Sequence, residues 1–521
     1  MMRRFTLLFS LPLLTVSTVT VAQEAPVEDA APKAEAPKTE APQQVAIDLE
    51  DLPKVHLEFR ATESFLSDFP VDAEGHTLGQ EGWLDTRLRV SFEQSIGTLS
   101  MVTEWDIFSG QFAGDTWNVP ASSDERHRDQ FAAMNLRGIV PRRLSFSGKT
   151  SAGAWEAGLV TSHWGLGMVA NNGAEEPLFG RSDFGDRVFR LRFTTLPFKS
   201  GDKPFPLYLT AAVDQVMADD MALLSEQQLA TQGILSVLYR SKELETGLYG
   251  VFRHQWEVEA SRTTTAGMID GYLSAPLALG DNGWKLTLAA EAAGILGNTN
   301  RATTYNATDR VDVLSGGATL QTSLAAPEDM FIARFHAGWA SGDANPDSTL
   351  STDFTFDRDY AVGMVLFDQV MGGVEAATHA LLSDPQYSGQ PPDGVEALTT
   401  EGAFRRAAYA QPILQFKLNS DVNLRVGTLV AVATAPIAQP FYSYRAGGVP
   451  TTHHNLASSG DYLGTELNWA VESHRPWPNQ TTQDDGLTLL VSGGHAFLSS
   501  DLAGEGPARV DLFMLMARAR Y

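Results

Sequence analysis

Apolar and polar residues alternate one by one through many short segments of the chain after residue 53. The alternation is clear at 55–62, 84–93, 99–107, 189–193, 207–214, 284–292, 331–339, 422–426, 463–472 and 513–521. Successive side chains of a β-strand point to opposite faces, so a period of two gives each strand one apolar and one polar face. The pattern therefore predicts an all-β body whose strands place one face in a core or against lipid.

About 18 or 19 such segments follow one another, each roughly ten residues long, which is the length of a tilted strand that crosses a bilayer. Short connections at 240–245 and 419–422 contrast with long polar ones at 109–128, 169–186, 340–359 and 373–403. In transmembrane barrels the short turns face the periplasm and the long loops face outward. We predict an antiparallel transmembrane β-barrel of about 18 strands.

A soluble β-sandwich is the alternative, because its strands also alternate between an apolar inner face and a polar outer face. Three features favour the barrel. The polar faces carry arginines at positions i and i+2, aromatic residues recur at strand ends as in an interfacial girdle, and an export signal occurs in a chain without cysteine.

The chain is predicted to divide into three parts. Two arginines precede an apolar run at 5–21, and small residues occupy both cleavage positions before Gln23, which indicates a signal peptide at 1–22 rather than an uncleaved anchor. Residues 23–52 repeat Ala, Pro and Glu, a composition typical of a disordered periplasmic linker. We expect this linker to be a plain spacer rather than a segment that binds peptidoglycan. The barrel is expected to occupy 53–521.

Charge and composition narrow the function classes. The chain has 63 acidic and 38 basic residues, a net charge of −25, which argues against a nucleic-acid-binding protein. It has no cysteine, which excludes disulfides, thiolate nucleophiles and cysteine-ligated metal sites. No apolar run after the signal reaches the roughly 18 residues that a spanning helix needs.

Three stretches resemble the alginate export family of outer-membrane porins, including myxobacterial-type relatives without an assigned substrate. They are 164–173 (WGLGMVANNG), 340–347 (ASGDANPD), after which the chain resumes at 354–360, and 462–469 (YLGTELNW). The resemblance is close over about 40 residues and loose over the whole body. It implies an 18-stranded monomeric barrel that passes an anionic polysaccharide through an arginine-lined constriction.

Arginines on the polar faces are the candidate pore lining. A guanidinium group pairs bidentately with carboxylates and keeps its charge, so such a wall would favour passage of an anionic chain. Alternatively, glutamates on the same faces neutralise the arginines: Glu58, Glu93, Glu104, Glu156, Glu245, Glu291 and Glu466. The predicted lining residues are Arg60, Arg87, Arg89, Arg190, Arg192, Arg253, Arg334, Arg425, Arg518 and Arg520, with Arg143 as a further candidate.

Metal binding and catalysis have little support. Asp343, Asn345 and Asp347 form a weak calcium candidate in an extracellular loop, without the spacing of an EF-hand. His453 and His454 lie in a polar loop without a nearby third ligand, so we do not predict a metal site there. No Gly-x-Ser-x-Gly elbow or other nucleophile motif occurs, so we do not predict an enzyme.

The sequence thus predicts an outer-membrane porin or export channel for an anionic polysaccharide or another small anionic solute, without a cofactor beyond that calcium ion. The predicted partners are outer-membrane lipid, lipopolysaccharide, the barrel-assembly machinery and the polysaccharide itself, with no nucleic acid and a monomeric state. Phe513 and the terminal Tyr521 are the predicted assembly signal. One alternative is a barrel closed by folded-in loops with a structural or adhesion role, and a less favoured one is an outer-membrane hydrolase.

Overall fold

The computed structural model describes residues 53–115, 137–182, 185–200, 203–258, 261–280, 282–301, 310–345, 348–382, 384–387, 389, 402–478 and 485–521. The predicted signal peptide at 1–22 and linker at 23–52 lie outside these residues. The first strand begins at Lys54.

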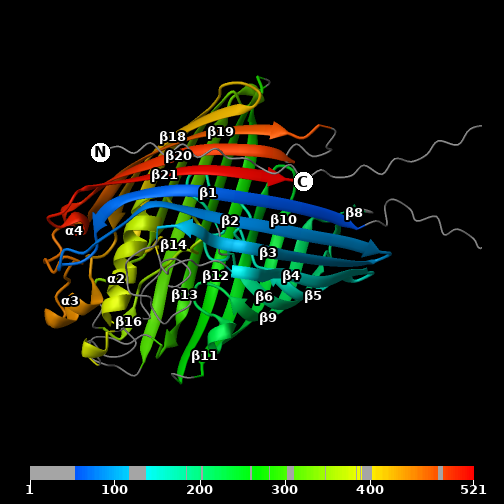
Figure 1. The fold of residues 1–521 in the computed structure, drawn as a ribbon. Helices are drawn as coiled ribbons and strands as arrows, with labels where there is room; N and C mark the ends of the chain where they lie inside the picture. Colours follow the sequence, from blue (N-terminus) through cyan, green and yellow to red (C-terminus); the bar gives the residue numbers. More distant parts are fainter. Residues whose placement is uncertain are drawn as a thin grey trace, which may run out of the picture. The chain divides into compact units, whose positions relative to one another are not determined.

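Within the described chain, 18 strands form one closed antiparallel barrel (Figure 1). Each strand pairs with its neighbours in chain order, and the first strand, β1, also pairs with the last, β21, from Glu58↔Arg520 to Leu66↔Leu512. The predicted fold class is therefore confirmed. The strands are β1 (Lys54–Pro70), β2 (Thr77–Ile96), β3 (Leu99–Gly114), β4 (Arg137–Thr150), β5 (Gly153–Thr161), β6 (Arg187–Thr195), β9 (Leu207–Ala218), β10 (Gln228–Arg240), β11 (Glu245–Glu257), β12 (Arg262–Leu279), β13 (Trp284–Thr299), β14 (Val311–Ala325), β15 (Phe331–Ala340), β17 (Ala407–Lys417), β18 (Val422–Ala433), β19 (Tyr462–Pro476), β20 (Gly486–Leu498) and β21 (Arg509–Arg520).

The alternation of the sequence separates the two faces of the wall. Phe59 is 48 % exposed whereas Arg60 is 5 % exposed, and Val213 is 58 % exposed whereas Asp214 is 1 % exposed. A closed sheet leaves no unpaired edge, and an apolar outer band suits lipid, which is how strands cross the outer membrane. The protein is an outer-membrane β-barrel. The outer band includes Leu191, Leu235, Leu248, Phe252, Ile269, Leu296, Leu314 and Leu515.

The two ends of the barrel carry different connections. At one end the turns are short, as at 241–244 and 418–421, and by the usual topology this end faces the periplasm. The opposite end carries the long loops, among them 162–186, 341–406 and 434–461. Short elements lie in the connections: β7 (Lys199–Ser200), β8 (Lys203–Pro204), β16 (Leu350–Ser351), η2 (Leu224–Glu226), η3 (Pro327–Asp329), η4 (Leu366–Met371), η5 (Pro385–Tyr387), α2 (Gly372–Leu382), α3 (Pro440–Arg445) and α4 (Ser500–Ala503).

Two long loops fold into the barrel instead of standing outside it. The loop 162–186 and the connection 341–406, which carries α2, pack against the inner wall, and α2 is seen among the strands in Figure 1. Their side chains form an apolar core inside the lumen, which includes Met168, Phe179, Phe354, Phe356, Tyr360, Met364, Leu366, Phe367, Val370 and Val374. In the described residues, no helix is long and apolar enough to cross a membrane.

The segment 354–360, at the end of the long loop predicted at 340–359, lies in the lumen, where Phe356 and Tyr360 stack edge to face at 5.2 Å. One sequence interpretation is wrong in detail. Leu463 is buried inside the barrel rather than facing lipid. The register between β18 and β19 shifts next to it, where Val432 pairs with Tyr462 and Ala431 with Gly464, and this irregularity turns Leu463 inward.

Candidate functional site

The structure places the ten predicted lining arginines on the inner face of the wall. Each lies on a strand between neighbours that point outward, as Arg190 does between Phe189 and Leu191, which are 45 % and 63 % exposed. Arg143 pairs in register with Glu104, which itself faces Arg89 and Arg142 on the inner face. The lumen therefore gathers arginines from strands far apart in the sequence.

Three arginines stand at one level of three neighbouring strands. Arg60 of β1 pairs in register with Arg87 of β2 on one side and with Arg518 of β21 on the other. Arg60 is 5 % exposed and Arg87 is 6 % exposed. We call these three residues, with Arg89, Arg142 and Arg520 beside them, the arginine belt.

Carboxylates of the wall and of a folded-in loop pair with the arginines of the belt. Glu58 is shared, because its Oε1 accepts a hydrogen bond from Arg87 at 2.6 Å and its Oε2 accepts one from Arg520 at 2.6 Å. Arg518 forms an ion pair with Glu176, which belongs to the folded-in loop 162–186. The loop thus contributes to the electrostatics of the wall that it covers.

The adjoining strands carry a denser network. Arg89 donates two hydrogen bonds to Asp106, at 2.7 and 2.9 Å, in the bidentate geometry that makes such pairs strong. Arg142 donates to Glu104 at 3.2 Å and to the carbonyl oxygen of Asn172 at 2.6 Å. Sequence reasoning missed Arg142 because the strand pairing is irregular between Glu104 and Trp105 opposite it, which turns two successive arginines of β4 inward.

The remaining predicted arginines lie elsewhere around the wall. Arg190 binds Asp214 through two hydrogen bonds of 2.8 and 2.7 Å, and Arg253 binds Asp219 at 2.5 Å. Arg192 pairs with Glu156 at 2.7 Å and Arg425 with Glu472 at 2.9 Å. Arg334 donates to the amide oxygen of Gln415 at 2.8 Å. Most of these charges are thus matched one to one.

Six of the seven predicted neutralising glutamates, all except Glu93, divide into two groups. Glu58, Glu104, Glu156 and Glu245 pair with arginines, as expected from the alternative interpretation. Glu291 and Glu466 do not; both are almost fully buried and their carboxylates bind backbone N–H groups of the folded-in loops. For these two residues the predicted neutralising role is wrong.

Each of these two carboxylates holds a loop by the same arrangement. Glu466 accepts hydrogen bonds from the backbone of Met364, Val365 and Leu366, at 2.6, 3.1 and 2.7 Å. Glu291 accepts from the backbone of Leu166 and, at 3.2 Å, from Met168. We call Glu466 and Glu291 the loop anchors.

A glycine with positive φ comes just before the bound N–H groups in both loops. At Gly363 (φ +71°) an added Cβ would lie 2.8 Å from both carboxylate oxygens of Glu466. At Gly165 (φ +58°) it would lie 2.4 Å from Oε2 of Glu291. Only glycine permits both the left-handed backbone and this close approach of the carboxylate.

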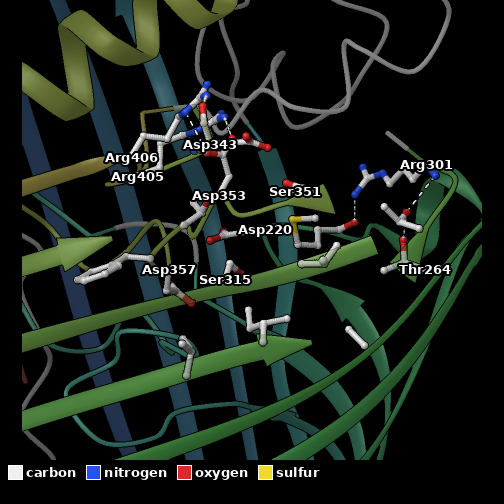
Figure 2. A pocket seen from close by; sticks show the side chains of 18 of the residues that line it. Asp220, Thr264, Arg301, Ser315, Asp343, Ser351, Asp353, Asp357, Arg405 and Arg406 are labelled. Carbon is white, nitrogen blue, oxygen red and sulfur yellow. Dashed lines mark hydrogen bonds and ion pairs between the residues drawn. The ribbon is translucent and has the colours of Figure 1, made fainter. Parts of the chain in front are cut away.

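The loops leave two cavities in the lumen. The outer chamber, toward the long-loop end, has a volume of about 460 Å³ and is lined in part by α2, 435–438 and His453. Figure 2 shows Arg405 and Arg406 grouped with Asp343 and Asp353 on one side of this chamber and Arg301 on the other. Arg406 lies 3.0 Å from Asp353, and Arg301 lies 2.5 Å from Glu257.

Carboxyl groups of the loops also line this chamber. In Figure 2, Asp220 and Asp357 lie below Asp353, on the side of the view that carries Arg405 and Arg406. Burial, together with the neighbouring Asp359 and Asp219, raises the pKa of Asp220 to about 7. Burial and the carboxylates of Asp186 and Asp220 hold the pKa of Asp357 well above its usual range. Proton uptake therefore relieves the repulsion in this chamber near neutral pH.

The inner chamber, toward the periplasmic end, has a volume of about 320 Å³. Its wall on β13, β14, β15 and β17 is polar and includes Thr287, Gln321, Arg334, His336 and Gln411. Residues 175–179 and 359–361 of the folded-in loops line its other side.

Several residues of these sites lie in loops that sequence reasoning left without a role. Arg301, Arg405 and Arg406 lie next to strands, whereas Arg358 lies inside the connection 341–406, and none of the four belongs to the alternation of a strand. The adjacent Arg405 and Arg406 were the only sequence signal, but their partner Asp353 is more than fifty residues away.

The calcium candidate is only partly described, because Asp347 lies outside the described residues. Asp343 Oδ1 accepts a hydrogen bond from the backbone of Asn345 at 2.9 Å. Among the residues that the structure describes, no three His, Asp or Glu side chains are grouped as a metal site. The calcium site stays a prediction.

The last strand, β21, carries Phe513 and is followed directly by Tyr521, the two residues of the predicted assembly signal. Phe513 faces outward, 6.4 Å from Phe65, and Tyr521 closes the barrel through two backbone hydrogen bonds of 2.8 Å with Leu57. Their role as an assembly signal stays a prediction. His495 contacts Asp511 at 2.7 Å on the same face, and its described hydrogen-bond partners, Asp511 and Arg509, include no nucleophile.

No protein-family model matches the chain, and no curated protein matches it significantly. Solved structures with a similar fold include Acinetobacter baumannii OccAB1, with 10 % identity and a TM-score of 0.49 over 90 % of this chain and 96 % of that chain. The outer membrane protein OprD from Pseudomonas aeruginosa matches with 11 % identity and a TM-score of 0.46 over 90 % and 94 % of the two chains. Pseudomonas aeruginosa OpdK, solved with vanillate, matches with 10 % identity and a TM-score of 0.46 over 90 % and 98 %.

Proposed function

We propose that the protein is an outer-membrane channel for small anionic solutes. The arginine belt supports this function. Arg60, Arg87 and Arg518 stand side by side across three strands, and Glu58 is divided between Arg87 and Arg520. Guanidinium groups gathered on a lumen wall lower the electrostatic barrier for an anion.

The folded-in loops favour a small cargo over a polysaccharide. An unobstructed barrel of this strand number would leave a wide aqueous channel. Here the loop side chains form a core inside the lumen, and the remaining chambers measure about 460 and 320 Å³. Cavities of roughly 300 to 1,000 Å³ hold single small molecules. Alginate export, which the sequence resemblance implies, stays a prediction for the case in which the loops move aside.

Flux into proteoliposomes tests the proposal. The full chain is reconstituted, and uptake is compared for a monomeric uronic acid, a neutral sugar of the same size and a uronic acid oligomer of about ten units. We expect the monomeric acid to enter faster than the neutral sugar, and the oligomer to stay outside. Equal entry of acid and neutral sugar would contradict an anion channel, and entry of the oligomer would contradict the size limit.

A plugged barrel with a structural or adhesion role is the second candidate. The observation in its favour is the apolar packing of Phe354, Phe356 and Phe404 inside the lumen, with ring centroids 5.9 and 4.8 Å apart. This candidate predicts no uptake of any of the three solutes by correctly assembled protein. We also propose that the protein is a monomer without enzymatic activity. Its proposed partners are outer-membrane lipid, lipopolysaccharide and the barrel-assembly machinery.

A further inference from the structure

All lysines that follow residue 53 lie at the periplasmic end of the barrel. They occupy strand ends and the short connections there: Lys54, Lys149, Lys199, Lys203, Lys242, Lys285 and Lys417. By sequence, no lysine occurs in any of the long connections of the opposite end. In Figure 1, β8, which carries Lys203, lies at the end opposite α3 and α4. The lysines therefore mark one rim of the barrel.

Four of these lysines belong to the inner face of their strands. Positions separated by an even number of residues share one face of a regular strand. Such a spacing, without a register shift, separates each of the four from a residue that is at most 5 % exposed: Lys54 from Arg60, Lys149 from Ser145, Lys285 from Glu291 and Lys417 from Ile413. These four lysines therefore border the lumen, and we call them the lysine mouth.

Two residues of the lysine mouth lie between the inner chamber and the periplasmic rim. Lys285 is the next inward position after Thr287, which lines that chamber. Lys417 is the next inward position after Gln415, whose amide oxygen accepts a hydrogen bond of 2.8 Å from Arg334 of the same chamber. The lysines and Arg334 are thus successive cationic positions along one side of the lumen.

The lysines differ from the arginines of the wall in their partners. All lysines whose side chains the structure describes are exposed, and none of them forms an ion pair or a side-chain hydrogen bond. Arg190, in contrast, is bound to Asp214 by two hydrogen bonds. A planar guanidinium group fits a fixed bidentate partner, whereas an ammonium group is a hydrated charge on a flexible stem. The lysines therefore suit an anion that binds and leaves.

Carboxylates also occur at this end. In the described pairings of the lysine mouth, Lys54 alone faces a carboxylate, that of Glu93, and the other partners are Ala154, Ala278, Ala325 and Asn423. On the inner face of β19, Glu472 is already bound to Arg425 at 2.9 Å. Further carboxylates lie in the connections, where no strand directs them toward the lumen: Glu243, Glu328, Asp329, Asp421 and Asp485.

We propose that the lysine mouth is a binding site for small multivalent anions at the periplasmic entrance of the lumen. This proposal deepens the proposed function and rests on it for the passage of the bound anion. Like charges around an opening add their potentials. In water, one charge about 10 Å away raises the local concentration of a monovalent anion about twofold, and the factor multiplies with each lysine and each charge of the anion.

The inward direction of the lysine mouth favours a dissolved anion over a lipid phosphate. The neighbouring outward positions are apolar, as at Val55, Leu286 and Phe416. A lipid headgroup would meet these residues first, whereas a solute in the lumen meets the ammonium groups.

Fluorescence anisotropy of a trivalent dye, methoxypyrene trisulfonate, tests the site. The full chain is held in phosphatidylcholine nanodiscs at about 20 mM salt, where the Debye length is about 20 Å. Two variants remove the same charge: K285Q/K417Q from the lysine mouth, and K199Q/K242Q from the connections. We expect the Kd of the dye to rise about fivefold in K285Q/K417Q and less than about twofold in K199Q/K242Q.

The variants also separate this proposal from general attraction to a charged rim. An unchanged Kd in K285Q/K417Q, or an equal rise in both variants, would overturn the proposal. If K285Q/K417Q does not assemble, K54Q/K149Q takes its place, with the same expected rise.

Dye binding does not require solute passage, so the lysine mouth and the channel can fail separately. A barrel that binds the dye through its inward lysines but admits no uronic acid would support the lysine mouth and contradict the channel. Uptake of the acid without lysine-dependent binding of the dye would support the channel and overturn the lysine mouth.

Discussion

Glutamates on the inner face of the barrel have different partners at the arginine belt and at the loop anchors. In the belt, Glu58 pairs with side chains of neighbouring strands, whereas Glu466 and Glu291 bind the backbone of loops that cross the lumen. The belt therefore gives the wall a cluster of cationic side chains, and the anchors hold the loops that narrow the lumen.

Strand register decides which purpose a glutamate serves. Glu58 stands in register with Arg89 and Arg520, so guanidinium groups are within its reach. Glu466 stands between Leu429 and Ala496, and Glu291 stands between Tyr272 and Thr319, so neither has a cationic neighbour in register. A buried carboxylate without a cationic partner needs other donors, and the loop backbone supplies them.

Removing an anchor should have the largest effect. Glu466→Ala leaves three backbone N–H groups of 364–366 without their acceptor. We expect a loss of about 3 kcal/mol or more in stability, measured by denaturant unfolding, because hydrogen bonds to a charged group contribute about 1.5 to 3 kcal/mol each. Single-channel conductance should rise, since the segment that carries α2 is no longer held.

Glu245→Ala is the matched control, because Glu245 pairs with the half-exposed Arg240 across a short turn. We expect it to change stability by less than about 1 kcal/mol and conductance not at all. If Glu466→Ala behaved like this control, the anchors would have no part in narrowing the lumen.

Replacing Arg190 and replacing Arg192, which both lie on β6, should lower the stability of the barrel by different amounts. Arg190→Ala leaves the carboxylate of Asp214, which is 1 % exposed, without its bidentate partner. Uncompensated buried charges cost about 3 kcal/mol or more, so we expect assembled protein to unfold at lower denaturant concentration. Arg192, whose side chain is 43 % exposed, should cost less than about 1 kcal/mol when replaced by Ala. Similar losses for both variants would show that the contribution of an ion pair on the inner wall to stability does not depend on its burial.

The outer chamber should make ion selectivity depend on pH. Asp220, with its pKa raised to about 7 by burial and by Asp359 and Asp219, is mostly neutral at pH 6 and mostly ionised at pH 8. Because the folded chain holds this proton more tightly than an unfolded chain would, ionisation above pH 7 also weakens the packing around it. One charge about 7 Å from the path is worth about 0.6 kcal/mol in water, or about threefold in permeability ratio. Anion preference should therefore rise on acidification.

Asp220→Asn supplies the control for that titration. The amide does not ionise, so reversal potentials of this variant should stay constant from pH 6 to pH 8. A pH dependence equal to that of the wild type would assign the titration to another group, such as Asp357.

Alternation along the chain was enough to predict the strands, their faces and the inward arginines, because a period of two is a local property. The positions of 162–186 and 341–406 could not be predicted in this way, because their contacts join residues far apart in the sequence. Glu466 binds the backbone at 364–366 about a hundred positions away, and nothing near Gly363 indicates that contact. The alternation also failed at Arg142 and Leu463, where irregular strand pairing changes the face.

The central claim is that anchored loops narrow the barrel and that the narrowed barrel still conducts anions. Planar-bilayer recording of the full chain in a salt gradient tests this claim most directly. The assembled protein should insert as discrete conductance steps, and the sign of its reversal potential should show anion preference at pH 6. Assembled protein that gives no steps would contradict the claim and establish a closed lumen. Steps with cation preference at pH 6 would show that the carboxylates of the loops, rather than the arginine belt, determine what passes.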